Sequence, residues 1–456
     1  NGVHAQDFAF GFNFEHKFAN NWTLRYNGKF SNKLADWQTS ISNAFVSLND
    51  PLAYFISGAE FPIGQIVFKD AQTDTEIARL NNSGILAGES FEYLNGGSLP
   101  NDAIMGTSAW YKNNKANEWI DQLQINKVWK NHDFNLGTSL GISNSSLFTQ
   151  GSFAYVTYEP NPRLLKVTVE NPNEDIVSLS DSNGLSNYGG LFFINGDAKV
   201  RQLSVFANDR YIINEKLTAD LGLRYENINH RGFKDRFEPF EREGGLDMDV
   251  STAYDNGILA PNGIRDDFDY TYDYLSLSGG LNYQFSNSLS VFASYSLGNK
   301  APELDYYFNN FSNVPITNKG EIQRIALYEL GLKWRRRDFS TTLTGFLSQL
   351  NNIGISNFEF DSEEDSIFFT PIQFNSSRSI GLEWESAYSP VNNLIVRLNG
   401  TIQDTKAQKW TIYDASETID PSDDVITDYS GNTLPLAPKL DLKLKTEYQI
   451  KKFNTF

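Results

Sequence analysis

Cysteine is absent from the 456 residues, and histidine and methionine are scarce, with 4 and 2 copies. Without thiols, the chain can form neither a disulfide nor a thiolate metal site. No run reaches the roughly 18 to 20 consecutive apolar residues that a membrane-spanning helix needs, so helical membrane proteins are excluded. The net charge of -18, with no basic stripe, argues against nucleic-acid binding. A chain of this kind can cross a membrane only as a closed β-barrel, which satisfies every backbone hydrogen bond in hydrocarbon.

Strict alternation of apolar and polar residues runs through most of the chain and indicates β-strands with two unlike faces. In the first predicted strand, Phe8, Phe10, Phe12 and Phe14 share one face, and a short turn at 19–21 follows. The same unit recurs along the chain, and thirteen strands are predicted in all. Further short turns are expected at 130–132, 214–216, 286–288, 335–338 and 389–393.

The connections between predicted strands alternate between short and long. The long ones are expected at 32–117, 143–199, 228–272, 298–324, 351–376 and 405–437. Outer-membrane barrels show this asymmetry, with strands of about ten residues, short periplasmic turns and long extracellular loops. We therefore predict an all-β protein, a transmembrane antiparallel β-barrel with long extracellular loops.

Charged residues gather on one face of the predicted strands, whereas the other face carries almost none. Those expected to line the lumen are Arg25, Lys29, Arg224, Glu226, Glu329, Lys333, Glu383, Glu385 and Arg397. A soluble antiparallel sheet with one solvated face gives the same alternation. That alternative explains neither the loop asymmetry nor the Trp and Tyr residues near strand ends, where interfacial girdles belong.

Several segments resemble the TonB-dependent outer-membrane receptors. The segment at 289–307, LSVFASYSLGNKAPELDYY, is similar to a family strand that ends in Tyr-Ser-x-Gly and is followed by Ala-Pro-Glu-Leu. Other similar pieces, in family order, are YELGLKW at 328–334, FSTTLTGF at 339–346, IGLEWE at 380–385, LIVRLNGTIQD at 394–404 and GNTLPLAPKLDLKL at 431–444.

The resemblance implies a barrel of about 22 strands, filled by an N-terminal plug. It also implies a receptor of the bacterial outer membrane, not an enzyme, that imports a siderophore, glycan, peptide or vitamin with energy from the TonB complex. A surface lipoprotein is a further expected partner, besides the lipid bilayer and the nutrient. Residues 1–456 are then expected to be a partial barrel of about 13 strands, with the plug upstream. The alternatives are a passive porin-like channel and a structural or secretion-associated barrel in an outer-membrane assembly.

Aromatic residues in the long connections are the candidates for ligand binding, because they can stack on a sugar, peptide or chelate. They are Trp37, Trp110, Tyr111, Tyr306, Tyr307 and Trp410. The alternative is that these side chains pack the loops together. No other sequence feature distinguishes one nutrient class from another.

Three acidic clusters, at 266–269, 361–365 and 420–424, fall in predicted loops. Calcium prefers such oxygen ligands, but the spacing is not that of an EF-hand, so solvated charge is the first expectation and loop-bound calcium the alternative. No other cofactor is expected, and the sequence identifies no metal ligands. Gly137 to Gly141 matches the Gly-x-Ser-x-Gly pattern of hydrolases. A mid-strand position does not provide the elbow that this chemistry requires, so no catalytic residue is expected.

Overall fold

The computed structural model describes most of the chain. The described residues are 2–49, 65–81, 90–170, 176–186, 192–240, 248–249, 258–308, 319–355, 358–361, 366–369, 372–414 and 425–450. Their regular structure is β-strand, with single-turn 3-10 helices such as η1 (Ala19–Asn21), η3 (Pro100–Asp102) and η4 (Leu304–Tyr306). In this part of the chain, no helix is long and apolar enough to cross a membrane.

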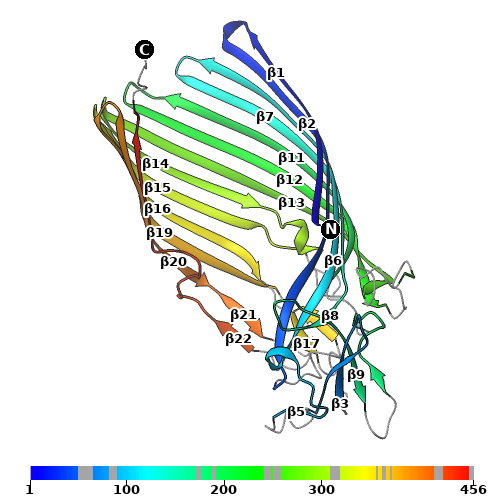
Figure 1. The fold of residues 1–456 in the computed structure, drawn as a ribbon. Helices are drawn as coiled ribbons and strands as arrows, with labels where there is room; N and C mark the ends of the chain where they lie inside the picture. The colour runs from blue at the N-terminus through cyan, green and yellow to red at the C-terminus, as the bar shows by residue number, and fades with distance from the viewer. Residues whose placement is uncertain are drawn as a thin grey trace, which may run out of the picture.

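Thirteen strands form one continuous antiparallel wall, in which each strand pairs with the next one named here. They are β1 (Gly2–Phe18), β2 (Trp22–Ser47), β6 (Ala103–Trp129), β7 (His132–Gly151), β11 (Phe192–Ile212), β12 (Leu217–Pro239), β13 (Leu259–Ser286), β14 (Leu289–Lys300), β15 (Gln323–Arg335), β16 (Phe339–Ile355), β19 (Gln373–Val391), β20 (Leu394–Lys409) and β23 (Leu440–Tyr448). Figure 1 shows these strands as a curved, tilted wall with β1 and β23 at its two edges. The predicted all-β class and the thirteen strands are confirmed for the described residues.

Short turns connect neighbouring strands at one end of the wall, because the chain there contains residues that favour tight turns. Asn20 and Asn21 occupy the left-handed region, with φ of 61° and 59°, which Asn tolerates better than most residues. In the turn before β12, the side-chain Oδ1 of Asn214 accepts hydrogen bonds from the backbone N–H groups of Lys216 and Leu217. The opposite end carries the long connections, as the sequence indicates.

The long connections are shorter than predicted, because the wall strands continue far beyond ten residues. β2 and β6 pair from Trp22 to Ser47, so residues predicted as loop between 32 and 47 are strand. β13 likewise begins at Leu259, inside the predicted loop at 228–272. Alternation of hydrophobicity fades where the strands leave the apolar region, but the backbone pairing does not depend on it. The predicted loop boundaries are therefore wrong at these positions.

Six short strands form a second structure at the long-loop end, which we call the cap sheet. They are β3 (Gln65–Asp70), β4 (Glu76–Asn81), β5 (Glu92–Tyr93), β8 (Ala154–Thr157), β9 (Leu164–Glu170) and β10 (Val177–Ser178). β9 pairs with β3 along one edge and with β8 and β10 along the other. β8 also pairs with β6, which joins the cap sheet to the wall. Two smaller hairpins are β17 (Phe358–Asp361) with β18 (Ser366–Phe369) and β21 (Thr411–Asp414) with β22 (Val425–Asp428).

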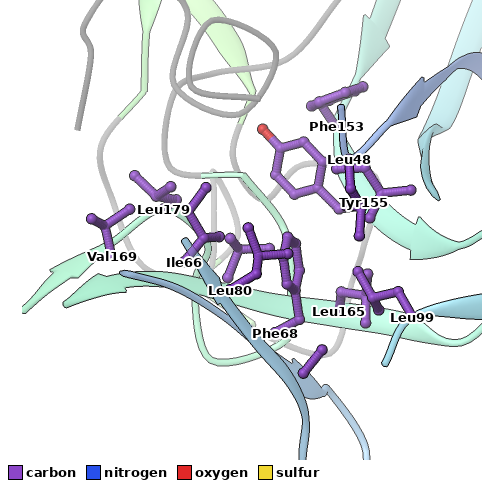
Figure 2. Packing of buried hydrophobic residues seen from close by; sticks show 13 residues of the cluster. Leu48, Ile66, Phe68, Leu80, Leu99, Phe153, Tyr155, Leu165, Val169 and Leu179 are labelled. Carbon is purple, nitrogen blue, oxygen red and sulfur yellow. The ribbon is translucent and has the colours of Figure 1, made fainter. Parts of the chain in front are cut away.

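Among the described residues, the largest buried apolar cluster lies in and around the cap sheet. Figure 2 shows side chains from segments far apart in sequence, such as Phe68, Leu80 and Leu165, packed against one another. Each of these three side chains is completely buried. Many apolar residues of the wall point outward instead: Phe10, Leu136 and Leu398, for example, are 64%, 44% and 42% exposed. A soluble sheet would bury such a face, so the wall has the arrangement expected against lipid.

Candidate functional site

The apolar outer face of the wall ends at a sharp boundary on the side of the long connections. Outward positions change from Leu203 to Arg201 on β11 and from Leu275 to Asp273 on β13. At the boundary on β12, Tyr225 donates a 2.6 Å hydrogen bond from its hydroxyl to Oδ1 of Asp273. A tyrosine with its ring in the apolar region and its hydroxyl on a carboxylate is typical of a membrane interface.

The other end of the apolar band carries a second aromatic group. The rings of His132 and Tyr211 stack at 4.3 Å, and Trp129 lies 6.0 Å from the His132 ring. His132 Nδ1 also lies 2.7 Å from Oδ2 of Asp209. The band between these two boundaries contains the residues that would face hydrocarbon.

The residues predicted to line the lumen all lie on the face opposite the apolar band. Three ion pairs show how this face is organised: Arg25 Nε donates to Oε2 of Glu15 at 2.8 Å, Arg224 Nη2 to Oε1 of Glu226 at 2.8 Å, and Arg397 Nη1 to Oε2 of Glu447 at 2.6 Å. Hydroxyls take part as well, because Ser294 Oγ donates to Glu329 at 2.6 Å. Part of the luminal charge is thus paired within the wall itself.

Aromatic rings that cover glycines are a second feature of the luminal face, and no local pattern in the sequence indicates them. Phe206 lies over Gly137 on the neighbouring strand, where an added Cβ would stand 2.4 Å from the ring. Phe292 covers Gly331 in the same way, and Phe346 covers Gly381. The guanidinium of Arg224 lies 5.7 Å from the Phe206 ring, and the Lys333 ammonium lies 4.8 Å from the Phe292 ring. Only the strand register reveals these pairs.

This packing also explains the apparent hydrolase motif. Gly137 is small because the Phe206 ring occupies the space beside it. Ser139 lies within β7, which continues as strand to Gly151, and its Oγ is 2.5 Å from Oγ of Ser204. The strand-to-helix elbow of a serine hydrolase is not present around Ser139.

Two of the predicted ligand-binding aromatics come together on the luminal side of the extended strands. The rings of Trp37 on β2 and Trp110 on β6 lie 5.0 Å apart. Tyr111 points to the outer side, where its ring lies 5.9 Å from that of Phe148. Trp410 lies elsewhere, between β20 and β21, where its backbone N–H donates to Ser430 Oγ. The structure therefore groups Trp37 with Trp110 but not with Tyr111 or Trp410.

Residues 301–308, which we call the strap, fold over the luminal side of β12 and β13 just above the apolar band. Tyr307 in this strap is completely buried, with its ring stacked 4.6 Å from that of Phe268 and its hydroxyl bonded to that of Tyr272. Tyr306 beside it remains partly exposed. Tyr307 thus packs the strap against the wall, whereas part of the Tyr306 side chain remains accessible to a ligand.

His230 lies beneath the strap and is 5% exposed. Its ring is 5.7 Å from those of Tyr272 and Tyr307. Within the described part of the chain, its Nδ1 atom is buried without a hydrogen-bond partner. Burial lowers the pKa of His230, because the charged imidazolium loses its hydration there.

The acidic cluster at 266–269 is part of β13 and not of a loop, so its predicted placement is wrong. Asp266 accepts hydrogen bonds from both Nε and Nη2 of Arg236, at 3.0 and 2.9 Å. Nearby, burial lowers the pKa of Lys234 to about 8, against the opposing effect of Asp266. Residues 362–365 and 420–424 lie outside the described residues. Among the described residues, no group of three or more His, Asp or Glu side chains could hold a metal ion, so loop-bound calcium stays a prediction.

The arrangement of wall and lumen agrees with the protein family whose model the sequence matches. Residues 1–456 match the family model described as TonB dependent receptor-like, beta-barrel. The chain thus belongs to the family of TonB-dependent receptor β-barrels, whose members are transport receptors of the outer membrane. No match was found among curated proteins.

Three of the solved structures that match this chain are uptake, import or siderophore receptors. The ferric yersiniabactin uptake receptor FyuA from Yersinia pestis is 8% identical, with a TM-score of 0.42, and the match covers 99% of this chain and 66% of that one. The ferric-catecholate import receptor Fiu from E. coli K12, in its open form, is 12% identical, with a TM-score of 0.48 and coverages of 98% and 49%. The siderophore receptor PiuA from Acinetobacter baumannii is 12% identical, with a TM-score of 0.46 and coverages of 99% and 66%. The chain thus spans between about half and two thirds of these proteins.

Proposed function

We propose that this chain is the wall of an active importer in the bacterial outer membrane, which brings a scarce nutrient into the periplasm. The observation that carries the proposal is the two-sided wall of a TonB-dependent receptor barrel: an exposed apolar band outside and a hydrated, ionic face inside. The long connections and cap sheet would lie outside the cell, and the short turns in the periplasm.

The luminal face is suited to a plug that must move. Some of its charges pair with neighbours on the same wall, as Arg25 does with Glu15 and Arg224 with Glu226. Ion pairs that remain accessible to water are individually weak. A plug held by such water-accessible contacts could therefore be displaced by a pull from the TonB complex. The plug and the TonB-contacting segment are expected in the full-length protein.

Ligand capture would begin at the aromatic residues of the extracellular end. Trp37 and Trp110 form a pair on the luminal side, and Tyr306 is partly exposed on the strap. Such rings stack on planar or apolar parts of a ligand, so siderophore, glycan, peptide and vitamin classes all fit. A surface lipoprotein that presents the ligand remains an expected partner, and so does a calcium ion in the acidic loops.

Uptake measurements test this proposal. A strain lacking the gene should lose growth on one nutrient class, and a strain lacking TonB should show the same loss. Complementation with the full-length gene should restore growth, and Trp37→Ala with Trp110→Ala should weaken ligand binding to the purified full-length receptor. Uptake that survives loss of TonB would favour the passive porin-like channel. Normal uptake together with defective assembly or secretion of another protein would favour a structural barrel.

A further inference from the structure

We propose that the outer surface of the wall carries a binding site for the phosphorylated headgroup of an outer-leaflet lipid. The site is an open groove of about 540 Å³ that crosses β6, β7, β11 and β12 on the lipid-facing side. It is separate from the lumen, and the inference goes beyond the proposed uptake function.

Three cations and two amides supply the chemistry of the groove. Strand register places four residues side by side in one row across the four strands: Asn117, Asn144, Lys199 and Arg231. Lys115 lies two residues before Asn117, on the same face of β6. Ammonium, guanidinium and amide groups are the donors that phosphate oxygens prefer. All five of these residues are exposed, so their donors are free to meet a ligand from outside.

Cations outnumber carboxylates in the lining of the groove, where Lys115, Lys199 and Arg231 stand against Asp197. Beside the lining, Asp269 and Asp267 on β13 stand opposite Arg231 and Phe233, and Oδ2 of Asp269 lies 3.9 Å from Nε of Arg231. At the edge of the groove, the guanidinium of Arg265 lies 3.5 Å from the centre of the Phe233 ring. This guanidinium also donates a hydrogen bond to Asp235, so its charge is paired. Lys115 and Lys199 are not offset in this way by any ion pair among the described residues. A cationic cluster of this kind is notable in a chain whose net charge is -18.

The height of the groove on the wall points to a lipid as the source of the phosphate. Going toward the periplasm, the next outward side chains are Trp119 on β6 and Ile142 on β7, which belong to the apolar band. On β11, Arg201 alone separates Lys199 from Leu203, and successive outward residues are about 6.6 Å apart along a strand. A phosphate in the groove would thus lie at headgroup level, with acyl chains against the band directly below it. A free anion would make no use of that apolar surface.

Lipid retention by the full-length receptor tests the assignment. The purified receptor would be incubated with a diphosphorylated acylated glycolipid, its dephosphorylated counterpart or inorganic phosphate, and bound molecules would be counted by native mass spectrometry. The test variant is Lys199→Gln with Arg231→Gln. A matched control, Arg163→Gln with Lys166→Gln, removes one Lys from β9 and one Arg from the residue just before it, beyond the wall.

We expect the wild type and the control to retain the diphosphorylated lipid and to prefer it to the dephosphorylated form. Each basic residue near an anionic surface contributes about fivefold in affinity, so the double variant should bind about 25-fold more weakly. Equal retention by the double variant would overturn the site. Full displacement of the lipid by an equal concentration of inorganic phosphate would overturn its assignment to a lipid. Should the double variant fail to fold, the wild type's preference between the two lipids still decides, because equal binding of both contradicts the proposal.

Discussion

The cap sheet and the membrane wall are built from the same kind of strand but place their apolar side chains in opposite ways. In the cap sheet, Leu80 is completely buried among residues from distant segments, whereas Leu221 of the wall is 66% exposed. Both lie in alternating antiparallel strands, so local pattern does not distinguish them. The surroundings do: the cap sheet must exclude water by itself, whereas the wall leaves its apolar face to lipid. Substitution of an apolar residue should therefore change stability through lost packing in the cap sheet and through altered contact with lipid in the wall.

The largest effect is expected for Phe68→Ala in the cap sheet. The ring is fully buried, and removing such a ring costs about 3–5 kcal/mol. Hydrogen exchange should show faster exchange in β3, β4 and β9, while β12 and β13 keep their protection. A matched control is Phe45→Ala, because that ring is 69% exposed. Loss of protection throughout the wall would contradict the independence of the two regions.

A charge on the lipid face should have the next largest effect. Leu221→Arg places a guanidinium in the apolar band of β12 and should destabilise the folded receptor by about 2–4 kcal/mol. Unfolding in lipid vesicles by urea, followed by heat-modifiable gel mobility, measures this change. Asp220→Arg on the adjacent luminal position is the control and should have much less effect. Similar losses at both positions would mean that the two faces do not differ in their surroundings.

Acid should loosen the strap by a smaller amount. The pKa of His230 is lowered in the folded state, so the released state binds a proton more readily, and stability falls as pH drops below the unfolded value of 6.5. Tyr272 and Tyr307 face the ring, and Lys319, over the Tyr272 ring, adds a positive charge nearby. Hydrogen exchange of 301–308 should therefore be faster at about pH 5.5 than at about pH 7.5, after correction for intrinsic rates. His230→Phe should remove this dependence, and an unchanged dependence in that variant would assign it to another group.

The smallest effect is expected from breaking a luminal ion pair. Arg25 and Glu15 are each more than 40% exposed, and such pairs contribute little to stability. Arg25→Gln should leave the urea midpoint of the receptor unchanged within error. A large loss of stability in this variant would mean that the luminal face is much drier than its exposure indicates.

The sequence predicts the wall well but the extracellular end poorly. Alternation with a period of two and Asn-rich turns such as 19–21 are local signals, and they locate the strands and their short connections. β2 and β6 extend beyond the apolar band with apolar and polar residues mixed on both faces, so alternation does not indicate their full length. For the same reason, the pattern at 266–269 predicts a loop, although these acidic residues belong to β13.

In the candidate site too, some residues are placed correctly by the sequence and others only by the structure. Charge on one face is sufficient to place residues such as Arg224 and Glu329 on the luminal side. By contrast, Phe206 over Gly137 depends on which residues of two strands stand opposite each other. The burial of Tyr307 depends on how the strap folds back, and neither fact has a local signal.

The sequence by itself thus determines a two-faced ribbon with its turns, because neighbouring residues set side-chain alternation and turn geometry. Only the tertiary structure decides how far each strand runs, which side chains form the cap core and where the strap lies. Those features depend on contacts between segments such as β3 and β9, whose residues Gln65 and Glu170 pair across a long stretch of chain. Such pairing is selected by the packing of the whole fold and has no counterpart in a short window of sequence.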